Sequence, residues 1–277
     1  MRLPDNLNYE VSGDRRSPAV LFLHGFMGSS ADWREVMAAL GDRAFCVAAD
    51  LPGHGASLGL STEAYTIEGS ARAVINTLDR LEVEHPTVVG YSMGGRLALF
   101  LALRYPGRCA GLFLESASPG LESASERAAR RAADGSKAKR LESGDLEAFL
   151  GDWYRQPLFA PLARDENLLH RIVQARRSNE PGELARSLRG MGAGNQPSLW
   201  RELEGLRVPV LAVAGGLDEK YARASSRMAV ISQRIQSELV RGVGHNVHDE
   251  APAEYVTLLE GFLDRLSLGL DEAEPVS

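Results

Sequence analysis

The chain has 277 residues, of which 44% are hydrophobic and 25% are charged, and its formal net charge is −6. These values are ordinary for a soluble globular enzyme, and the length suits one large α/β domain with an insertion. The negative charge argues against a nucleic-acid-binding protein, which normally carries a basic stripe. The first residues lack the apolar region of a signal peptide, and no segment approaches the roughly 18 apolar residues of a membrane span. We therefore expect a cytoplasmic protein with no membrane span.

Short apolar runs alternate with helix-like patterns along most of the chain. The runs are rich in Val, Leu and Phe, and they lie at residues 19–25, 45–50, 87–91, 109–116 and 208–216. The helix-like segments lie at residues 31–40, 67–81, 94–105 and 252–266. Strands of a parallel sheet that is covered on both faces have this pattern, so the alternation predicts a mostly parallel, doubly wound α/β sheet. In such a sheet, ligands bind at the carboxyl ends of the strands.

The alternation stops between Gly120 and Trp200. This stretch lacks a strong apolar run and has several helical patterns rich in Arg and Leu. We therefore expect a helical cap over residues 120–200, inserted between two strands of a core that is formed by residues 1–119 and 201–277. A helix face exposed to solvent would by itself explain most of the charged residues of the cap, and it is the simpler explanation for any single arginine.

The sequence gives no sign of a cofactor or a metal. Cys46 and Cys109 lie in apolar stretches without the spacing of metal ligands, so we expect two buried, reduced thiols. The sequence contains no dinucleotide fingerprint and no phosphate-binding loop. We therefore predict a site built from side chains and backbone groups alone.

The third apolar run leads into GYSMG, which matches the pattern Gly-x-Ser-x-Gly at Ser92. The pattern alone is weak, because chance gives about one match in ten chains of this length. Here, however, it joins a predicted strand to a predicted helix, which is the context of the nucleophile elbow. The elbow is a tight turn that needs small neighbours and presents the serine at the positive end of a helix.

A serine hydroxyl needs a base, and two histidines near the last predicted helix are candidates. His245 stands where such a base is expected, and His248, three residues later, is the alternative. The orienting carboxylate should lie between the serine and the histidine in chain order. Asp218 satisfies this order, whereas Asp50 precedes the serine. We predict that Asp218 holds the tautomer of His245, which in turn activates Ser92.

Two glycine-containing turns complete the pattern. LHGFMGS, at residues 23–29, follows the first apolar run, and its position predicts an oxyanion hole made by the backbone N–H groups of Phe26 and Met93. DLPGHGAS, at residues 50–57, follows the second run. Together with the elbow, these motifs resemble the α/β-hydrolase superfamily across nearly the whole chain.

Further stretches narrow the resemblance. They are GYSMGGR around the serine, then ERAARR, DWYRQPLF and ARRSN in the expected cap, and finally MGAGNQPSLWREL. Together they resemble the 2-succinyl-6-hydroxy-2,4-cyclohexadiene-1-carboxylate synthase family of the menaquinone and phylloquinone pathways. Ala193 departs from the family pattern, which often has Thr there, so the resemblance carries over no polar role for this position.

The resemblance implies that the partner of the site is a small substrate with three carboxylates, and it implies no nucleic acid. Guanidinium groups bind carboxylates in a bidentate manner, which suits the many arginines of these motifs. By motif, the resemblance assigns substrate binding to Tyr91, Arg96, Arg130, Trp153, Arg177 and Lys220. Arg127 and Arg131 are weaker candidates, because the helical phase could turn them toward solvent.

The resemblance also implies a lyase reaction, the elimination of pyruvate from 2-succinyl-5-enolpyruvyl-6-hydroxy-3-cyclohexene-1-carboxylate. Ser92 would then remove a proton instead of attacking a carbonyl carbon.

The alternative is a serine hydrolase of the same fold that acts on an ester or a carbon–carbon bond of an anionic compound. A non-catalytic binding protein is disfavoured because no member of the predicted triad is missing. Dehalogenases and epoxide hydrolases are disfavoured because their elbow residue is a carboxylate.

Overall fold

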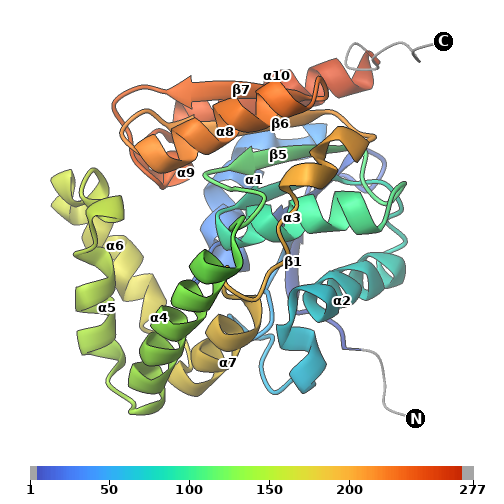
Figure 1. Ribbon diagram of the computed structural model, residues 1–277. Helices are drawn as coiled ribbons and strands as arrows, with labels where there is room; N and C mark the ends of the chain where they lie inside the picture. Colours follow the sequence, from blue (N-terminus) through green and yellow to red (C-terminus); the bar gives the residue numbers. More distant parts are fainter. Residues whose placement is uncertain (1–4, 270–277) are drawn as a thin grey trace.

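The apolar runs form strands of a single sheet in the computed structural model, which describes residues 5–269 (Figure 1). The strands are β1 (Tyr9–Ser12), β2 (Ala19–Leu23), β3 (Phe45–Ala49), β4 (Thr87–Tyr91), β5 (Gly111–Glu115), β6 (Val210–Gly215) and β7 (Ile235–Val240). Their order in the sheet is β1-β3-β2-β4-β5-β6-β7. The β1–β3 pair is antiparallel, and the other strand pairs are parallel. The predicted mostly parallel α/β sheet is therefore confirmed.

Helices cover both faces of this sheet. One face packs against α2 (Ile67–Arg80), α3 (Met93–Arg104) and α8 (Glu219–Ile231), and the other against α1 (Arg34–Leu40), the short α9 (Val247–Glu250) and α10 (Pro252–Ser267). Strand side chains alternate between the two layers, as Leu21 and Phe22 of β2 illustrate. Within residues 5–269, none of the helices combines the length and the apolar character needed to cross a lipid bilayer.

Four helices lie between β5 and β6 in the sequence, and we call them the cap helices. They are α4 (Ala124–Glu142), α5 (Leu146–Tyr154), α6 (Glu166–Arg176) and α7 (Pro181–Met191). Figure 1 shows them gathered to one side of the sheet, at the lower left. They share an apolar cluster of their own, to which Met27 of the sheet region also belongs. The helical character expected between Gly120 and Trp200 agrees with this arrangement, and the exact bounds 120–200 stay a prediction.

The edge strand β1 is absent from the predicted runs. It has four residues, with the sequence YEVS, and its side chains are half-buried or exposed. It pairs with one neighbour only, β3, at the end of the sheet. An edge strand that faces solvent does not need a continuous apolar run, so the apolar pattern gave no signal for it.

Both cysteines are buried and free, as expected. Burial raises the pKa of the Cys46 thiol to about 11 and that of the Cys109 thiol to about 12. Both side chains are therefore protonated at neutral pH and pack as small apolar groups.

The strand order reverses at β2, and this reversal locates the site. From β2 the chain passes to β3 on one side, and then returns to β4 on the other side of β2. The loops that follow β2 and β4 therefore leave the sheet in opposite directions and open a crevice at the carboxyl ends of the strands. The turn at residues 23–29 and the elbow at Ser92 are these two loops.

Candidate functional site

Ser92 lies in a strained backbone conformation between β4 and α3. Its φ is 50° and its ψ is −102°, a region that costs a residue with a side chain about 1–3 kcal/mol. Two backbone hydrogen bonds hold this conformation. The Ser92 N–H donates to the carbonyl of Glu115 at 2.9 Å, and the Ser92 carbonyl accepts from the N–H of Arg96 at 3.1 Å. The turn thus fixes the serine above the end of β4.

The two glycines of the Gly-x-Ser-x-Gly pattern are required by close packing. A Cβ at Gly94 would lie 2.1 Å from the carbonyl oxygen of Leu23, at the end of β2. A Cβ at Gly90 would lie 2.7 Å from the carbonyl oxygen of Gly94. Any side chain at these positions would separate α3 from the sheet and displace Ser92.

Ser92, His245 and Asp218 form one chain of hydrogen bonds. His245 Nε2 lies 3.1 Å from Ser92 Oγ, and His245 Nδ1 lies 2.6 Å from Asp218 Oδ2. Asp218 is also the N-cap of α8, where its Oδ1 accepts from the N–H of Tyr221 at 3.3 Å. The three side chains follow β4, β6 and β7, so they meet because the carboxyl ends of parallel strands share one edge.

The alternative residues considered for these roles lie elsewhere. His248 points into the core, where its Nδ1 is 2.8 Å from both carboxylate oxygens of Glu115. Burial alone would lower the pKa of His248, but the charges of Glu115 and Asp249 raise it to about 9. Asp50 accepts hydrogen bonds from two backbone N–H groups of the neighbouring loops. His248 and Asp50 therefore have structural partners of their own, and it is His245 that contacts Ser92.

Phe26 and Met93 both line the cavity beside Ser92. Met93 is the first residue of α3, where an N–H group has no partner within the helix. The loop that carries Phe26 is held by His24, whose Nδ1 lies 2.7 Å from the carbonyl of Gly25, while its Nε2 accepts from the N–H of Leu51 at 2.9 Å. Burial lowers the pKa of His24, so the ring is neutral in this role. Whether the two amides hold an oxyanion stays a prediction.

The serine opens into a cavity of about 330 Å³ whose charged lining is cationic. One part of the wall is apolar and includes Phe26, Trp153, Leu158, Phe159, Leu188 and Met191, and Ala193 also borders the cavity. The charged lining residues are Arg96, Arg130, Lys137, Arg176 and Lys220, and in residues 5–269 the lining includes no Asp or Glu. Such a space favours an anionic ligand with an apolar body.

Arg96 is a buried cation bonded to neutral groups. It is 9% exposed, and its Nη1 donates to the carbonyl of Met191 at 3.0 Å and to Oε1 of Gln196 at 2.6 Å. Burial lowers the pKa of Arg96 to about 10, so the group is still charged at neutral pH. A buried charge without a carboxylate partner is costly, and an anionic ligand would offset this cost.

The other predicted binding residues, Arg177 excepted, surround the same cavity. Arg130 is half-buried, and its Nε donates to both carboxylate oxygens of Asp134 at 2.8 Å. Lys220 lies at the exposed rim, with Nζ 4.9 Å from the ring centre of Tyr221. Tyr91 donates its hydroxyl to Asn246 Oδ1 at 2.8 Å. Trp153 lies against Phe26, Phe149 and Phe159.

Arg177 does not line the cavity, and its neighbour Arg176 does. The buried positions of α6 are Leu168, Ile172 and Arg176, which recur every four residues on one face. Arg177 is the next residue, outside this face, and its exposed side chain pairs with Glu147 at 2.6 Å. The prediction that Arg177 lies in the binding site is therefore wrong. The preceding residue, Arg176, lies on the helix face that meets the cavity.

Arg127 and Arg131, the weaker candidates, also lie outside the cavity. Arg127 donates to the carbonyls of Leu121 and Glu122, and Arg131 donates to the carbonyl of Gly194 at 2.7 Å. These two arginines therefore fasten α4 to nearby backbone.

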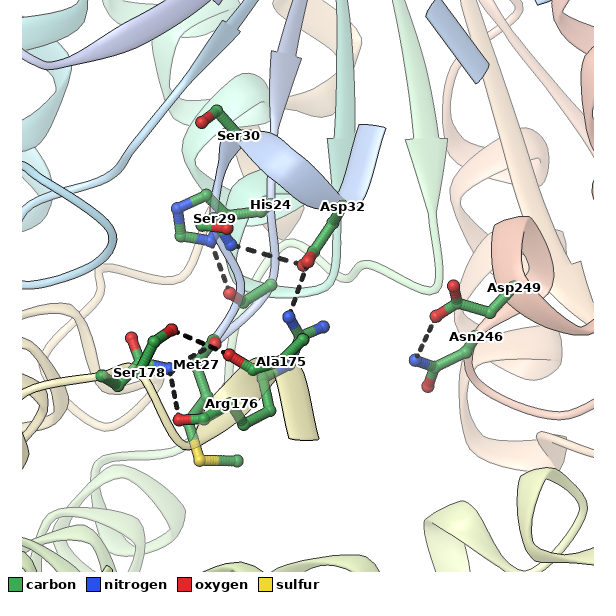
Figure 2. Close-up of polar contacts among 12 residues, drawn as sticks. His24, Met27, Ser29, Ser30, Asp32, Ala175, Arg176, Ser178, Asn246 and Asp249 are labelled. Atoms are coloured by element: carbon green, nitrogen blue, oxygen red, sulfur yellow. Dashed lines mark hydrogen bonds and ion pairs between the residues drawn. The ribbon is translucent and has the colours of Figure 1, made fainter. Parts of the chain in front are cut away.

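Arg176 ties the cap helices to the loop that follows β2, as Figure 2 shows. Its Nη1 lies 2.6 Å from Asp32 Oδ1, and both side chains are buried. Burial acts to raise the pKa of Asp32, but the charge and the hydrogen bond of Arg176, together with the nearby histidines, lower the pKa overall. Asp32 also accepts from the N–H of Ser29 at 3.3 Å, and Asn179 donates to the carbonyl of Met27 at 2.9 Å. The end of α6 thus holds the loop that carries Phe26.

Two cations of the cavity, Lys137 and Arg176, were not predicted. Helical periodicity indicates the position of both. Lys137 lies seven residues after Arg130 on α4, which is about two turns and places both on one face. Arg176 continues the apolar stripe of α6. Arg176 lies in the motif ARRSN, which does not show which of its two arginines faces the cavity, and Lys137 lies in none of the quoted motifs.

Comparisons with known proteins agree with this geometry. The model of the alpha/beta hydrolase fold family matches residues 18–252. A Bacillus subtilis protein, provisionally named a 2-succinyl-6-hydroxy-2,4-cyclohexadiene-1-carboxylate synthase, is 36% identical over 94% of this chain and 96% of its own length. An Escherichia fergusonii protein of the same name is 34% identical over 89% of this chain and 94% of its own.

Among solved structures, MenH from S. aureus has a TM-score of 0.89 at 31% identity, and the match covers 95% of this chain and 99% of that one. Its likeness extends through both the sheet region and the cap helices, as the coverage requires. The chain therefore belongs to the alpha/beta hydrolase fold family and, within it, to the family of 2-succinyl-6-hydroxy-2,4-cyclohexadiene-1-carboxylate synthases.

Proposed function

We propose that this protein eliminates pyruvate from 2-succinyl-5-enolpyruvyl-6-hydroxy-3-cyclohexene-1-carboxylate to give 2-succinyl-6-hydroxy-2,4-cyclohexadiene-1-carboxylate. One observation carries the proposal: the Ser92–His245–Asp218 chain opens into a cavity whose charged lining is cationic. The names of the relatives in the same family support it. We further propose that residues 120–200 act as a cap that supplies Arg130, Trp153 and Arg176 to the site.

Ser92 acts as the base in this proposal. Asp218 accepts a hydrogen bond from the protonated Nδ1 of His245. The unprotonated Nε2 of His245 is then free to accept the hydroxyl proton of Ser92. As this proton moves to His245, Ser92 Oγ removes the ring proton alpha to the succinyl ketone. The electron pair passes to the ketone oxygen as an enolate. Collapse of the enolate forms the 2,4-diene and expels enolpyruvate, which takes up a proton and becomes pyruvate.

The enolate needs hydrogen-bond donors at the moment it forms. In this proposal the N–H groups of Phe26 and Met93 supply them, and the fixed loops after β2 and β4 hold these amides in place before the reaction starts. Loss of one such donor typically costs about 3–4 kcal/mol of barrier. The oxyanion hole would therefore contribute as much to the rate as a well-placed base does.

The charges of the cavity fit a substrate with three carboxylates. Of the five lining cations, Arg130 and Arg176 are paired with Asp134 and Asp32. Within residues 5–269, Arg96, Lys137 and Lys220 have no carboxylate within 4 Å. Three unpaired cations match three carboxylates, and the apolar wall matches the ring that carries them.

The test is incubation of the purified protein with the enolpyruvyl substrate while the absorbance of the diene and the amount of pyruvate are followed together. We expect both products to appear in equal amounts. Ser92→Ala should lower kcat by about 10³-fold or more, because the base is removed, while the variant still binds the substrate. Absence of diene in the wild type would exclude the elimination.

A second assay, with a generic aryl ester, separates the elimination from hydrolysis. A serine hydrolase would form an acyl group on Ser92 and would show a burst of product with a generic aryl ester. We expect no such burst at a rate near that of diene formation. An acyl-Ser92 intermediate trapped on the productive path would contradict the base role.

A further inference from the structure

Resting on the proposed function, we infer that Lys137 and the ring face of Trp153 form a carboxylate subsite that binds one of the three acid groups of the substrate. This subsite lies on the cap helices α4 and α5 and is distinct from Arg96 of α3 and Lys220 of α8, which line the same cavity. Lys137 is therefore a residue that sets affinity and specificity for a polyanion.

The position of Lys137 on α4 directs it into the cavity. Asp134 and Ala138 are the buried residues of this part of the helix, and Lys137 is half-buried beside them. Arg130 lies two turns earlier and lines the same cavity. The two cations thus stand along one wall, with Asp134 bound to Arg130 between them.

Lys137 has no carboxylate within 4 Å among residues 5–269, although most cations of the cap have one. Arg140, Arg155, Arg177 and Arg189 are each paired with Asp or Glu on the surface of the cap. Asp134, the nearest acid along the helix face, is engaged by Arg130. A half-buried ammonium without an anionic partner has given up part of its hydration, and a ligand carboxylate would restore the lost interaction.

Trp153 fixes the ammonium at the cavity wall. Lys137 Nζ lies 5.0 Å from the centre of the Trp153 ring, a cation–π contact. The ring itself is held by Phe149, with centroids 5.7 Å apart, and by Phe26, with centroids 5.2 Å apart. Because the ring face covers only one side of the ammonium, the N–H groups on its other side are available to a carboxylate.

The test compares two charge removals on the same helix. Lys137→Met keeps an unbranched side chain against Trp153 and removes the charge. Lys139→Met removes the same charge two residues later, from an exposed position outside the cavity. The measurements are KM and kcat for diene formation from the enolpyruvyl substrate.

We expect Lys137→Met to raise KM by about 10- to 100-fold, because one charge-assisted hydrogen bond is lost, while kcat changes by less than about threefold. Lys137→Arg should recover most of the affinity, and Lys139→Met should match the wild type. An unchanged KM in Lys137→Met, or an equal rise in Lys139→Met, would overturn the subsite and leave the elimination reaction standing. If Lys137→Met does not fold, Lys137→Gln is measured in its place.

A binding measurement keeps the subsite separable from the reaction. Titration with propane-1,2,3-tricarboxylate, followed by calorimetry, needs no turnover. We expect Lys137→Met to bind this trianion at least tenfold more weakly than the wild type and Lys139→Met do. If the wild type produces no diene, the proposed reaction fails, and the subsite is then judged by this titration alone. Equal dissociation constants in the wild type and Lys137→Met would overturn it.

Discussion

Two adjacent arginines at the end of α6 differ in environment because they differ by one residue of helical phase. Arg176 is buried, borders the cavity and pairs with Asp32. Arg177 is exposed and pairs with Glu147 on the surface. Removing one member of a buried ion pair lowers the free energy of unfolding strongly, because the remaining charge stays buried without a partner. An ion pair on the surface contributes little to the free energy of unfolding.

We therefore expect Arg176→Gln to lower the free energy of unfolding by about 3–5 kcal/mol, because it leaves Asp32 buried and unpaired. Arg177→Gln should change it by less than about 0.5 kcal/mol and should leave KM within about twofold of the wild type. Urea unfolding measures the free energy of unfolding, and steady-state kinetics measures KM. The double variant Arg176→Gln/Asp32→Asn should recover part of the loss, and equal losses in the two single variants would contradict the assignment.

The three residues that the resembled fold places in a fixed chain order could be singled out from the sequence, whereas the cavity residues whose position depends on helical phase were missed. Ser92, Asp218 and His245 each follow a strand, and their order along the chain singled them out. The phase of a helix, by contrast, depends on which face meets the cavity, and the arginine-rich motif at 175–179 leaves that phase open. Lys137 was missed for a different reason, because none of the quoted motifs includes it.

The turn from β4 to α3 is the element on which the site depends most. Its serine is strained, and its two glycines let α3 begin directly against the end of β2. The same contact joins the elbow to the loop that carries Phe26. A displacement here would therefore move both Ser92, the proposed base, and one of the two proposed oxyanion donors.

Gly94→Ala should lower both stability and activity. The new Cβ would meet the carbonyl oxygen of Leu23 at 2.1 Å and that of His24 at 2.7 Å, so backbone has to move. We expect a loss of about 1–3 kcal/mol in the free energy of unfolding and of about 100-fold in kcat. The matched control is Gly135→Ala in α4, where a Cβ meets nothing within 4 Å. That change should stabilise the protein by about 0.5–1 kcal/mol, since Ala favours a helix. Comparable destabilisation by both would mean that the elbow packing is not the cause.

The elements themselves followed from the sequence where burial on both faces or a clear helical period was present. The run at 87–91 coincides with β4, and the segment at 67–81 contains α2. The edge strands β1 and β7 and the helix α8 lie outside the predicted runs and segments. Edge position explains the two strands. The helix begins at the Asp218 cap and carries mostly polar residues, with Ser225 and Met228 as its buried positions, so its apolar stripe is too narrow to stand out.

At the scale of the whole molecule, a buried charge pair lies beneath the site. Glu115 ends β5 and His248 belongs to α9, and both are almost fully buried. The His248 ring lies 4.8 Å from that of Trp33 and 4.9 Å from that of Tyr91, which borders the cavity. The pair therefore joins the sheet, the helical layer on one face and the wall of the cavity. Its state of protonation bears on the stability of the entire fold.

This pair predicts how stability depends on pH. The pKa of His248 is raised to about 9 in the folded protein, against about 6.5 for an unperturbed histidine. Below pH 6.5 the folded and unfolded states both hold the proton, and the full stabilisation is present. Between pH 6.5 and 9 the unfolded state releases the proton first, so the free energy of unfolding falls as the pH rises, by a total on the order of 3 kcal/mol. Urea unfolding at a series of pH values measures this slope.

The double variant His248→Gln/Glu115→Gln is the control, because it removes both charges and keeps a hydrogen-bonding pair of similar size. Replacing His248 alone would leave the Glu115 carboxyl group buried without its partner. The difference in unfolding free energy between the wild type and the double variant should shrink steadily from pH 6 to pH 9.5. If the two proteins instead lose stability in parallel over this range, another group is responsible, and His248 does not hold its proton in the folded state.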